Sequence, residues 1–167
     1  MHRNVCNNIA TIIQGTPDAV AEVRGGGNYP DIRGTVRFYQ TEQGVIVYCD
    51  IYCLPTSGSG NCGRVFGFHI HEGDSCTGNT EDRFADTGAH YDGRSRRHPH
   101  HSGDLPPLFG NDGHALSIVL TDRFCVNEVI GRTAVIHDSP DDFMTQPAGN
   151  AGSKIACGVI CSNNCCS

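Results

Sequence analysis

Apolar and polar residues alternate along much of the chain with the period of two that is typical of β-strands. Residues 32–40 place Val36 and Phe38 on one face and polar side chains on the other, as expected of a strand with one buried face. Residues 45–54 form a second such run after the short turn 41–44. The two runs predict a β-hairpin.

Six further runs are rich in apolar residues and bounded by turn formers. They comprise residues 10–14, 19–24, 65–71, 114–122, 132–137 and 155–160. Together with the hairpin they predict about eight strands in a sandwich or flattened barrel, and the glycine-rich stretch 25–30 predicts a long hairpin connection. Residues 72–113 predict no strand or helix, and a loop of that length in a compact domain is typical of functional segments.

Composition supports an all-β class and a single domain. Valine and isoleucine together number 24, against 5 leucines, and glycine numbers 21, which favours strands and turns over helices. A chain of 167 residues has room for one core. We therefore expect one domain over residues 1–160, followed by a cysteine-rich tail over residues 161–167.

The charge of the chain argues against two classes of partner. The formal net charge is -6, and no long basic block occurs, so we expect neither nucleic acid nor an anionic membrane as a partner. No run approaches the roughly 18 apolar residues of a spanning helix, and the segment from Met1 to Cys6 lacks the apolar part of a signal peptide. We expect a soluble protein, cytoplasmic unless a leader was removed.

Ten cysteines have more than one interpretation. An oxidising compartment would pair many of them, whereas a reducing one would leave thiols for metal or redox chemistry. Cys49 and Cys53 would share one face of an extended strand, too far apart to bridge easily. The cysteines of the tail, residues 161–167, are compatible with unpaired thiols, soft-metal binding, cross-links between chains, or pairing with Cys6 or Cys62.

Histidine is the most concentrated chemical signal, since seven of the nine lie between Phe68 and Ala115. His69 and His71 are two residues apart in a predicted strand, so both rings project from one face while Phe68 and Ile70 point into the core. Two imidazoles on a rigid strand form half of a transition-metal site. Taken alone, the pair also fits two surface histidines.

Further donors follow in the long loop and at the end of a later strand. They are His90, His98, His100, His101, Asp104 and His137. Imidazoles with one carboxylate suit zinc, and imidazoles without thiolates suit copper as well. By themselves these residues are also compatible with a loop that zinc merely stabilises.

Four segments resemble the copper–zinc superoxide dismutase family. They are GFHIHEGDSC (67–76), GAHYDGRSRRHPHHSGDLPPL (88–108), IGRTAVIHD (130–138) and GNAGSKIACGVI (149–160). The similarity extends from about residue 32 to residue 160, with the motifs in the family's order. It implies an eight-stranded Greek-key β-barrel whose long loops hold the metals, and an enzyme that disproportionates superoxide to dioxygen and hydrogen peroxide by Cu(II)/Cu(I) cycling. The short loop after His71 and the element GDLPP imply the bacterial type.

The resemblance implies one copper and one zinc ion per chain. The copper ligands would be His69, His71, His90 and His137, and the zinc ligands would be His90, His98, His101 and Asp104. His90 would bridge the two ions as an imidazolate, and in the family this ring leaves copper and takes a proton when copper is reduced. His101 is preferred to His100 because it matches the family pattern His-x-Gly-Asp-Leu.

Three supporting features are implied in the same way. Asp141 would join a copper-bound and a zinc-bound histidine, and Cys76 and Cys157 would form an intrasubunit disulfide. Lys154, the only lysine of the chain, stands where the family has an arginine that attracts and anchors superoxide. Lysine keeps the charge but loses the planar fork, so we expect dismutase activity that is retained but reduced.

The sequence leaves two other functions open. One is a dismutase-like protein that binds copper or zinc without useful turnover because of Lys154. The other is a structural protein whose cysteines cross-link the barrel into an assembly. Because members of the family often form dimers, a homodimer is an expected assembly, although no interface residues follow from the resemblance.

Overall fold

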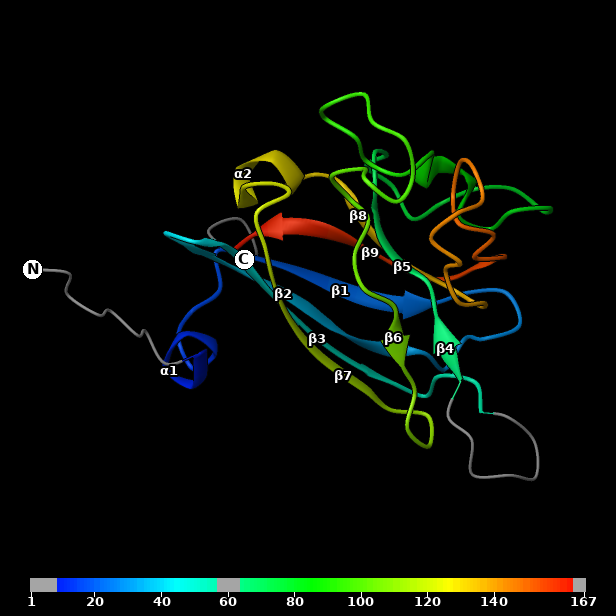
Figure 1. The fold of residues 1–167 in the computed structure, drawn as a ribbon. Helices are drawn as coiled ribbons and strands as arrows, with labels where there is room; N and C mark the ends of the chain where they lie inside the picture. Colours follow the sequence, from blue (N-terminus) through cyan, green and yellow to red (C-terminus); the bar gives the residue numbers. More distant parts are fainter. Residues whose placement is uncertain (1–8, 57–63, 164–167) are drawn as a thin grey trace, which may run out of the picture.

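Three antiparallel strand pairings build one half of the sheet. The computed structural model describes residues 9–56 and 64–163, and Figure 1 shows a curled sheet with long loops gathered on one side. In this half β1 (Ala19–Gly25) pairs with β2 (Arg33–Thr41), β2 with β3 (Gly44–Tyr52), and β3 with β7 (Ala115–Thr121). The predicted hairpin and the connection 25–30 are therefore confirmed.

The other half of the sheet carries the strands that present histidines. β9 (Lys154–Ser162) pairs with β1 on one side and with β8 (Thr133–His137) on the other, and β8 pairs with β5 (Phe68–His71). The resulting order is β5-β8-β9-β1-β2-β3-β7. Because β9 lies between β1 and β8, the last strand of the chain joins the two halves.

A short two-stranded ladder closes the curled sheet. β4 (Val65–Phe66) pairs with β6 (Leu108–Phe109), and β6 lies against β7. β4 continues directly into β5 across Gly67, so the predicted strand 65–71 is one segment that pairs first with β6 and then with β8. The all-β barrel expected from the sequence is thereby confirmed.

The barrel interior is filled by the apolar faces that the alternation predicts. Val36 and Phe38 of β2 are fully buried, and Phe68 and Ile70 of β5 belong to the same core. Other large buried side chains are Ile32, Ile51, Phe66, Leu108, Ile136 and Ile160. At about 1.5–3 kcal/mol for each large apolar side chain, this burial supplies the rigid wall on which the metal-binding loops rest.

The structure corrects several sequence predictions. Residues 10–14 form no strand: they overlap α1 (Ile9–Ile13), a short helix, because both edges of β1 are already occupied by β2 and β9. The stretch 72–113 is not without regular structure, since it contains η1 (Ala85–Thr87) and β6. A further short helix, α2 (Val126–Val129), precedes β8. No helix in the described ranges is long and apolar enough to cross a membrane.

The described cysteines also differ from one expectation. Cys49 is buried within β3, whereas Cys53 lies beyond the end of β3, exposed and with a φ of 60°. The prediction that they share a strand face is therefore wrong. Cys161 lies in β9 opposite Val20. The predictions for Cys6, Cys62, Cys165 and Cys166 fall outside the described residues.

Candidate metal centre

Backbone hydrogen bonds hold the long loop against β5. The Ile70 amide donates to the Gly103 carbonyl (2.9 Å), and the Tyr91 amide donates to the Ile70 carbonyl (2.8 Å). Isolated bridges also pair His69 with Asp104 and His71 with His90. Main-chain geometry thus places residues that are far apart in the sequence beside β5.

Two groups of metal donors meet at this position. The four-histidine cluster comprises His69, His71, His90 and His137, and the carboxylate cluster comprises His90, His98, His101 and Asp104. Within each group the donor atoms lie within 4.8 Å of one another, and all seven residues are buried or nearly so. The structure therefore brings together every ligand expected from the sequence. His100 is exposed and belongs to neither group.

His71 and His137 turn bare nitrogen atoms toward each other. The Nδ1 atoms of His71 and His137 lie 2.9 Å from the Gly88 carbonyl and 3.2 Å from the Gly152 carbonyl, so each Nδ1 carries the ring proton. The two Nε2 atoms are 3.2 Å apart. With both rings neutral, neither Nε2 has a proton to donate. Two lone pairs at this distance repel unless a cation lies between them.

Asp141 fixes one histidine in each cluster. Its carboxylate oxygens accept hydrogen bonds from Nε2 of His69 (2.7 Å) and from Nε2 of His98 (2.9 Å). Each Nδ1 is consequently bare, and within the described part of the chain both are buried without a hydrogen-bond partner. A carboxylate that accepts from the far nitrogen of a ligand histidine sets the tautomer of that ring, which is the role that the family resemblance implies for Asp141.

The carboxylate cluster shows the same arrangement of facing donors. Asp104 Oδ2 lies 3.2 Å from His98 Nδ1 and 3.3 Å from His101 Nδ1, yet neither nitrogen has a hydrogen-bond partner among the described residues. A tetrahedral zinc ion with bonds of about 2.0–2.1 Å holds its ligand atoms about 3.3 Å apart. The donor set and its spacing therefore fit zinc.

His90 belongs to both clusters through its two ring nitrogens. Its Nδ1 lies 2.8 Å from Asp104 Oδ1, and its Nε2 is buried without a partner in the described structure. Because the two nitrogens lie on opposite sides of one ring, Nε2 is the donor left for the four-histidine cluster. One imidazole is thus positioned between two cation sites.

Burial keeps the imidazoles neutral. Desolvation is the largest cause that lowers the pKa of His69, His71 and His137, and it brings the pKa of His137 to about 3. Burial alone would raise the pKa of Asp104, but its hydrogen bond with His90 and the nearby imidazoles outweigh burial and lower that pKa to about 2. Neutral rings at His69, His71 and His137 and an ionised Asp104 are the protonation states that metal binding requires.

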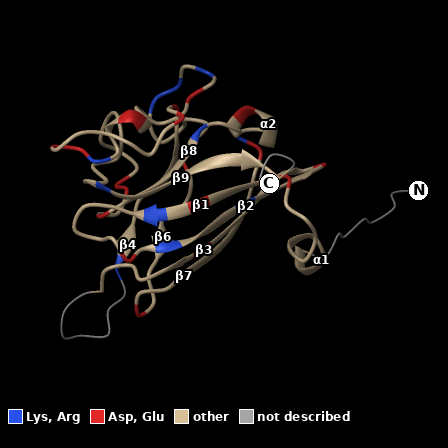
Figure 2. Cartoon of the chain, turned by 180° about the vertical axis from the view of Figure 1, so that it is seen from behind, with Lys and Arg blue, Asp and Glu red and all other residues tan. Residues whose placement is uncertain are grey.

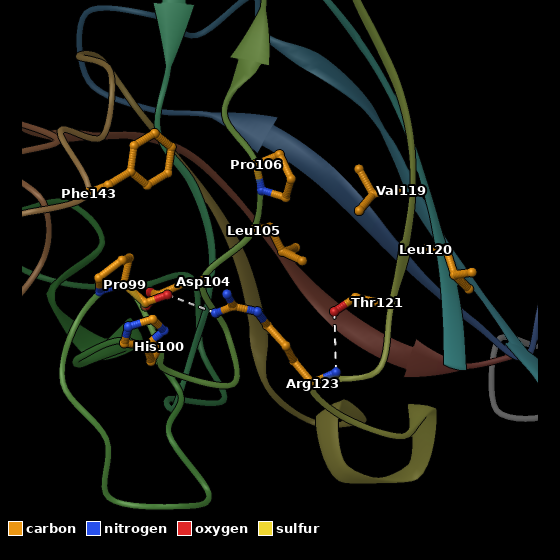
Figure 3. Close-up of a pocket in the computed structure, with 10 residues that line it drawn as sticks. All are labelled: Pro99, His100, Asp104, Leu105, Pro106, Val119, Leu120, Thr121, Arg123 and Phe143. Carbon is orange, nitrogen blue, oxygen red and sulfur yellow. Dashed lines mark hydrogen bonds between the residues drawn. The ribbon is translucent and has the colours of Figure 1, made fainter. Parts of the chain in front are cut away.

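Hydrogen bonds from outside the loop hold the carboxylate cluster in place. Arg123 Nη1 donates to the carbonyls of Pro99 (2.8 Å) and His101 (3.0 Å), beneath a pocket of about 340 Å³ that the loop shares with β7 (Figure 3). The Gln146 side chain donates to the His98 carbonyl (2.7 Å). Sequence reasoning missed both residues, because neither lies in a motif and their bonds go to main-chain atoms.

Lys154 lies beside the four-histidine cluster, not within it. It is the cross-strand partner of His137 and forms an ion pair with Asp82, with Nζ 2.8 Å from Oδ2. Asp82 was not foreseen, because nothing in the sequence relates residue 82 to residue 154. The predicted disulfide between Cys76 and Cys157 is present and ties the same loop to β9.

A family described as copper/zinc superoxide dismutase (SODC) matches residues 32–160. Superoxide dismutase (Cu-Zn) 2 of Aquifex aeolicus is 30% identical over 145 residues, which span 78% of this chain and 80% of that protein. A Cu-Zn superoxide dismutase of Deinococcus radiodurans is 38% identical over 112 residues, 56% of this chain and 62% of that one. The solved Cu/Zn superoxide dismutase from Brucella abortus superposes with a TM-score of 0.71 at 26% identity, covering 84% of this chain and 98% of that chain.

Proposed function

The chain belongs to the copper/zinc superoxide dismutase family, and we propose that its four-histidine cluster binds copper and its carboxylate cluster binds zinc during the disproportionation of superoxide. The overall reaction converts two superoxide anions and two protons into dioxygen and hydrogen peroxide. Copper, when bound, supplies the one-electron chemistry through Cu(II) and Cu(I), whereas zinc has a single oxidation state.

The protein contributes oriented, deprotonated donors. His71 and His137 donate hydrogen bonds from Nδ1 to the carbonyls of Gly88 and Gly152. The lone pair of each Nε2 therefore points into the four-histidine cluster. Asp141 does the same for His69 through the opposite ring nitrogen. Rings locked by backbone and carboxylate partners need little reorganisation between turnovers.

His90 is the residue we assign to proton delivery. Reduction of superoxide to hydrogen peroxide consumes two protons, and Nε2 of His90 can supply one of them when the ring is held through Nδ1 alone. The Asp104 carboxylate, 2.8 Å from Nδ1, holds the His90 ring in the carboxylate cluster. Because the buried Nε2 has no hydrogen-bond partner among the described residues, it can exchange that proton with substrate.

Lys154 is assigned to attraction of the superoxide anion. Its position opposite His137 supports this role, and its lack of a guanidinium fork supports activity that is retained but reduced. We also assign copper and zinc in a ratio of one ion each per chain. We assign the activity to a single domain. Because β9 ends at Ser162, the boundary at residue 160 that the sequence suggested falls inside a strand, and most of the cysteine-rich segment 161–167 lies outside the described residues.

The remaining assignments concern partners and location. Figure 2 shows acidic and basic residues interspersed over the loops that carry the site, without a single basic face. The net charge of -6 repels polyanions, which supports the expectation that neither nucleic acid nor an anionic membrane is a partner. Superoxide is the substrate that the family match supports. We expect a homodimer, which light scattering after gel filtration tests. The compartment, cytoplasm or the space outside it, does not enter the mechanism.

One observation carries the proposal: two clusters of bare donors share the ring of His90. The experiment that tests it is a superoxide-decay assay on protein loaded with copper and zinc, accompanied by metal analysis. Bound metal with catalysis supports the enzyme. Bound metal without catalysis would support the alternative of a copper- and zinc-binding protein, and a non-reducing gel separates both from a cross-linked structural protein.

A further inference from the structure

A β-bulge brings Lys154 next to the four-histidine cluster. Ile136 pairs with Ala156, but the next residue, His137, pairs with Lys154, so the register shifts and Ile155 is the extra residue. Bulges re-aim side chains, and directly paired residues have Cβ atoms about 4.5–5.5 Å apart on one face. The Lys154 charge is close enough to contribute to the lowered pKa of His137, after burial as the main cause.

The ammonium of Lys154 is held by a second loop. Nζ donates to Asp82 Oδ2 at 2.8 Å and to the Phe84 carbonyl at 3.1 Å, which uses two of its three protons. The Lys154 side chain is only 15% exposed, against 42% for Asp82. The cation beside the copper-binding histidines is thus mostly covered and already has an anionic partner.

Asp82 is fixed in the position from which it holds Lys154. The Phe84 amide donates to its Oδ1 (2.9 Å), and the Asn79 side chain accepts from its backbone amide (2.9 Å). Burial alone would raise the pKa of Asp82, but the hydrogen bonds from Lys154 and the Phe84 amide lower it. The carboxylate is therefore ionised and anchored at neutral pH.

The surrounding cavity gives an approaching anion little additional attraction. A polar cavity of about 510 Å³ contains the pair, and its charged lining residues are Lys154, Arg83, Glu81, Asp82 and Asp138. Two cations against three anions leave the lining with a formal net charge of -1. Because superoxide is itself an anion, it competes with Asp82 for the one lysine.

We propose that Asp82 is a positioning residue that occupies Lys154 and thereby weakens the binding of small monovalent anions, superoxide included, at the four-histidine cluster. The inference rests on the proposed function, since it assumes copper in that cluster. A half-exposed ion pair contributes about 0.2–1 kcal/mol, so an anion displaces the carboxylate at a modest cost and the site remains usable.

The test compares azide binding to copper- and zinc-loaded variants, followed by the optical spectrum of copper. Asp82→Asn keeps an acceptor for the Phe84 amide and removes the charge. It should tighten azide binding by about 1.4- to fivefold, the affinity equivalent of the pair's strength. Glu81→Gln removes a charge from the same cavity, and its side chain makes no hydrogen bond within the described structure. This control should change azide binding by less than half as much.

Repeating the Asp82→Asn substitution in Lys154→Met protein tests whether the change in azide affinity depends on Lys154. In Lys154→Met protein, adding Asp82→Asn should leave azide binding unchanged, because no cation remains to be released. Equal azide affinity in wild type and Asp82→Asn, a gain that matches Glu81→Gln, or a gain that persists without Lys154 would each overturn the inference. Asp82→Ala, which also removes the carboxylate, serves as the replicate if Asp82→Asn does not fold.

Wild-type turnover in the same samples separates the two claims. Active wild type with unchanged azide affinity in Asp82→Asn overturns only the role of Asp82. Copper-loaded wild type without dismutase activity overturns the proposed function, while the azide shift still decides whether Asp82 restrains Lys154. A chain that binds no copper overturns both.

Discussion

His71 and His137 face each other across 3.2 Å with their Nε2 atoms, while their Nδ1 protons are committed to the carbonyls of Gly88 and Gly152. These carbonyls come from two different loops, one before and one after β8. Both loops must therefore be in place for the pair of lone pairs to converge. The two Nε2 lone pairs repel each other at this distance, and a bound cation removes that repulsion.

Acid should destabilise the metal-free protein. Burial lowers the pKa of His137 to about 3 and also lowers the pKa of His69, whereas an unfolded histidine titrates near about 6.5. Between these values the unfolded chain binds more protons, so the free energy of unfolding falls as pH drops from about 6.5. Urea denaturation of metal-free protein across this range measures the effect.

The exposed His100 provides the control for this pH dependence. His100→Gln protein should show the same loss of stability in acid, because His100 is exposed and belongs to neither cluster. Unfolding free energies of metal-free wild type that stay constant between about pH 4.5 and about pH 7 would show that the buried rings are not held neutral.

Asp141→Asn should weaken the binding of both metals. The carboxylate orients His69 and His98, one in each cluster, and losing such a partner costs about 10- to 100-fold in metal affinity. Competition with chelators measures the two affinities separately. Asp142→Asn is the matched control, because the carboxylate of the neighbouring Asp142 bonds only to Met144 and Thr145 in the described structure. A loss confined to one metal would contradict the bridging role.

Gly149→Ala should disturb the Asp141–His98 contact directly. Gly149 has a φ of 64°, and a Cβ there would overlap the Asp141 carboxylate and lie 2.7 Å from His98 Nε2. Gly27→Ala is the control, since Gly27 has a φ of 60° with open space around it. Both variants carry a backbone strain of about 1–2 kcal/mol, but only Gly149→Ala should also weaken zinc binding, as measured by chelator competition. Equal zinc affinity in the two variants would refute this account.

The barrel was predictable from sequence where residues repeat with a simple period. The alternation that places Val36 and Phe38 on one face predicts β2. The spacing of two residues predicts that His69 and His71 lie on the same face of a strand. The contacts that tune the site were not predictable in this way. Lys154 meets Asp82 only because a bulge shifts β9 by one residue and a loop without periodicity folds across it.

The helix α1 shows that strand propensity alone can predict the wrong structure. Ile12 and Ile13 have high strand propensity, but the sheet has no free edge beside β1 for them to join. Local hydrogen bonds, such as Gln14 amide to Ala10 carbonyl, then satisfy the backbone instead. Propensity decides the structure of a segment only when a partner strand is available.

Substitution of Lys154 should change the rate in both directions. Lys154→Arg restores a planar fork for the anion and should raise kcat/KM about threefold or more, whereas Lys154→Met removes the charge and should lower it about tenfold and flatten its dependence on ionic strength. Pulse radiolysis at several salt concentrations measures both effects. Equal rates for the three proteins would mean that Lys154 takes no part in attracting superoxide.

The central claim, that the clusters sharing His90 form a copper–zinc dismutase centre, is tested most directly by superoxide decay in pulse radiolysis at a known amount of bound copper. Wild type loaded with copper and zinc should accelerate the decay catalytically, in proportion to bound copper, while zinc-only protein and His137→Ala protein should not exceed buffer. Stoichiometrically bound copper with no acceleration, or zinc-only protein as active as the copper-loaded form, would contradict the account.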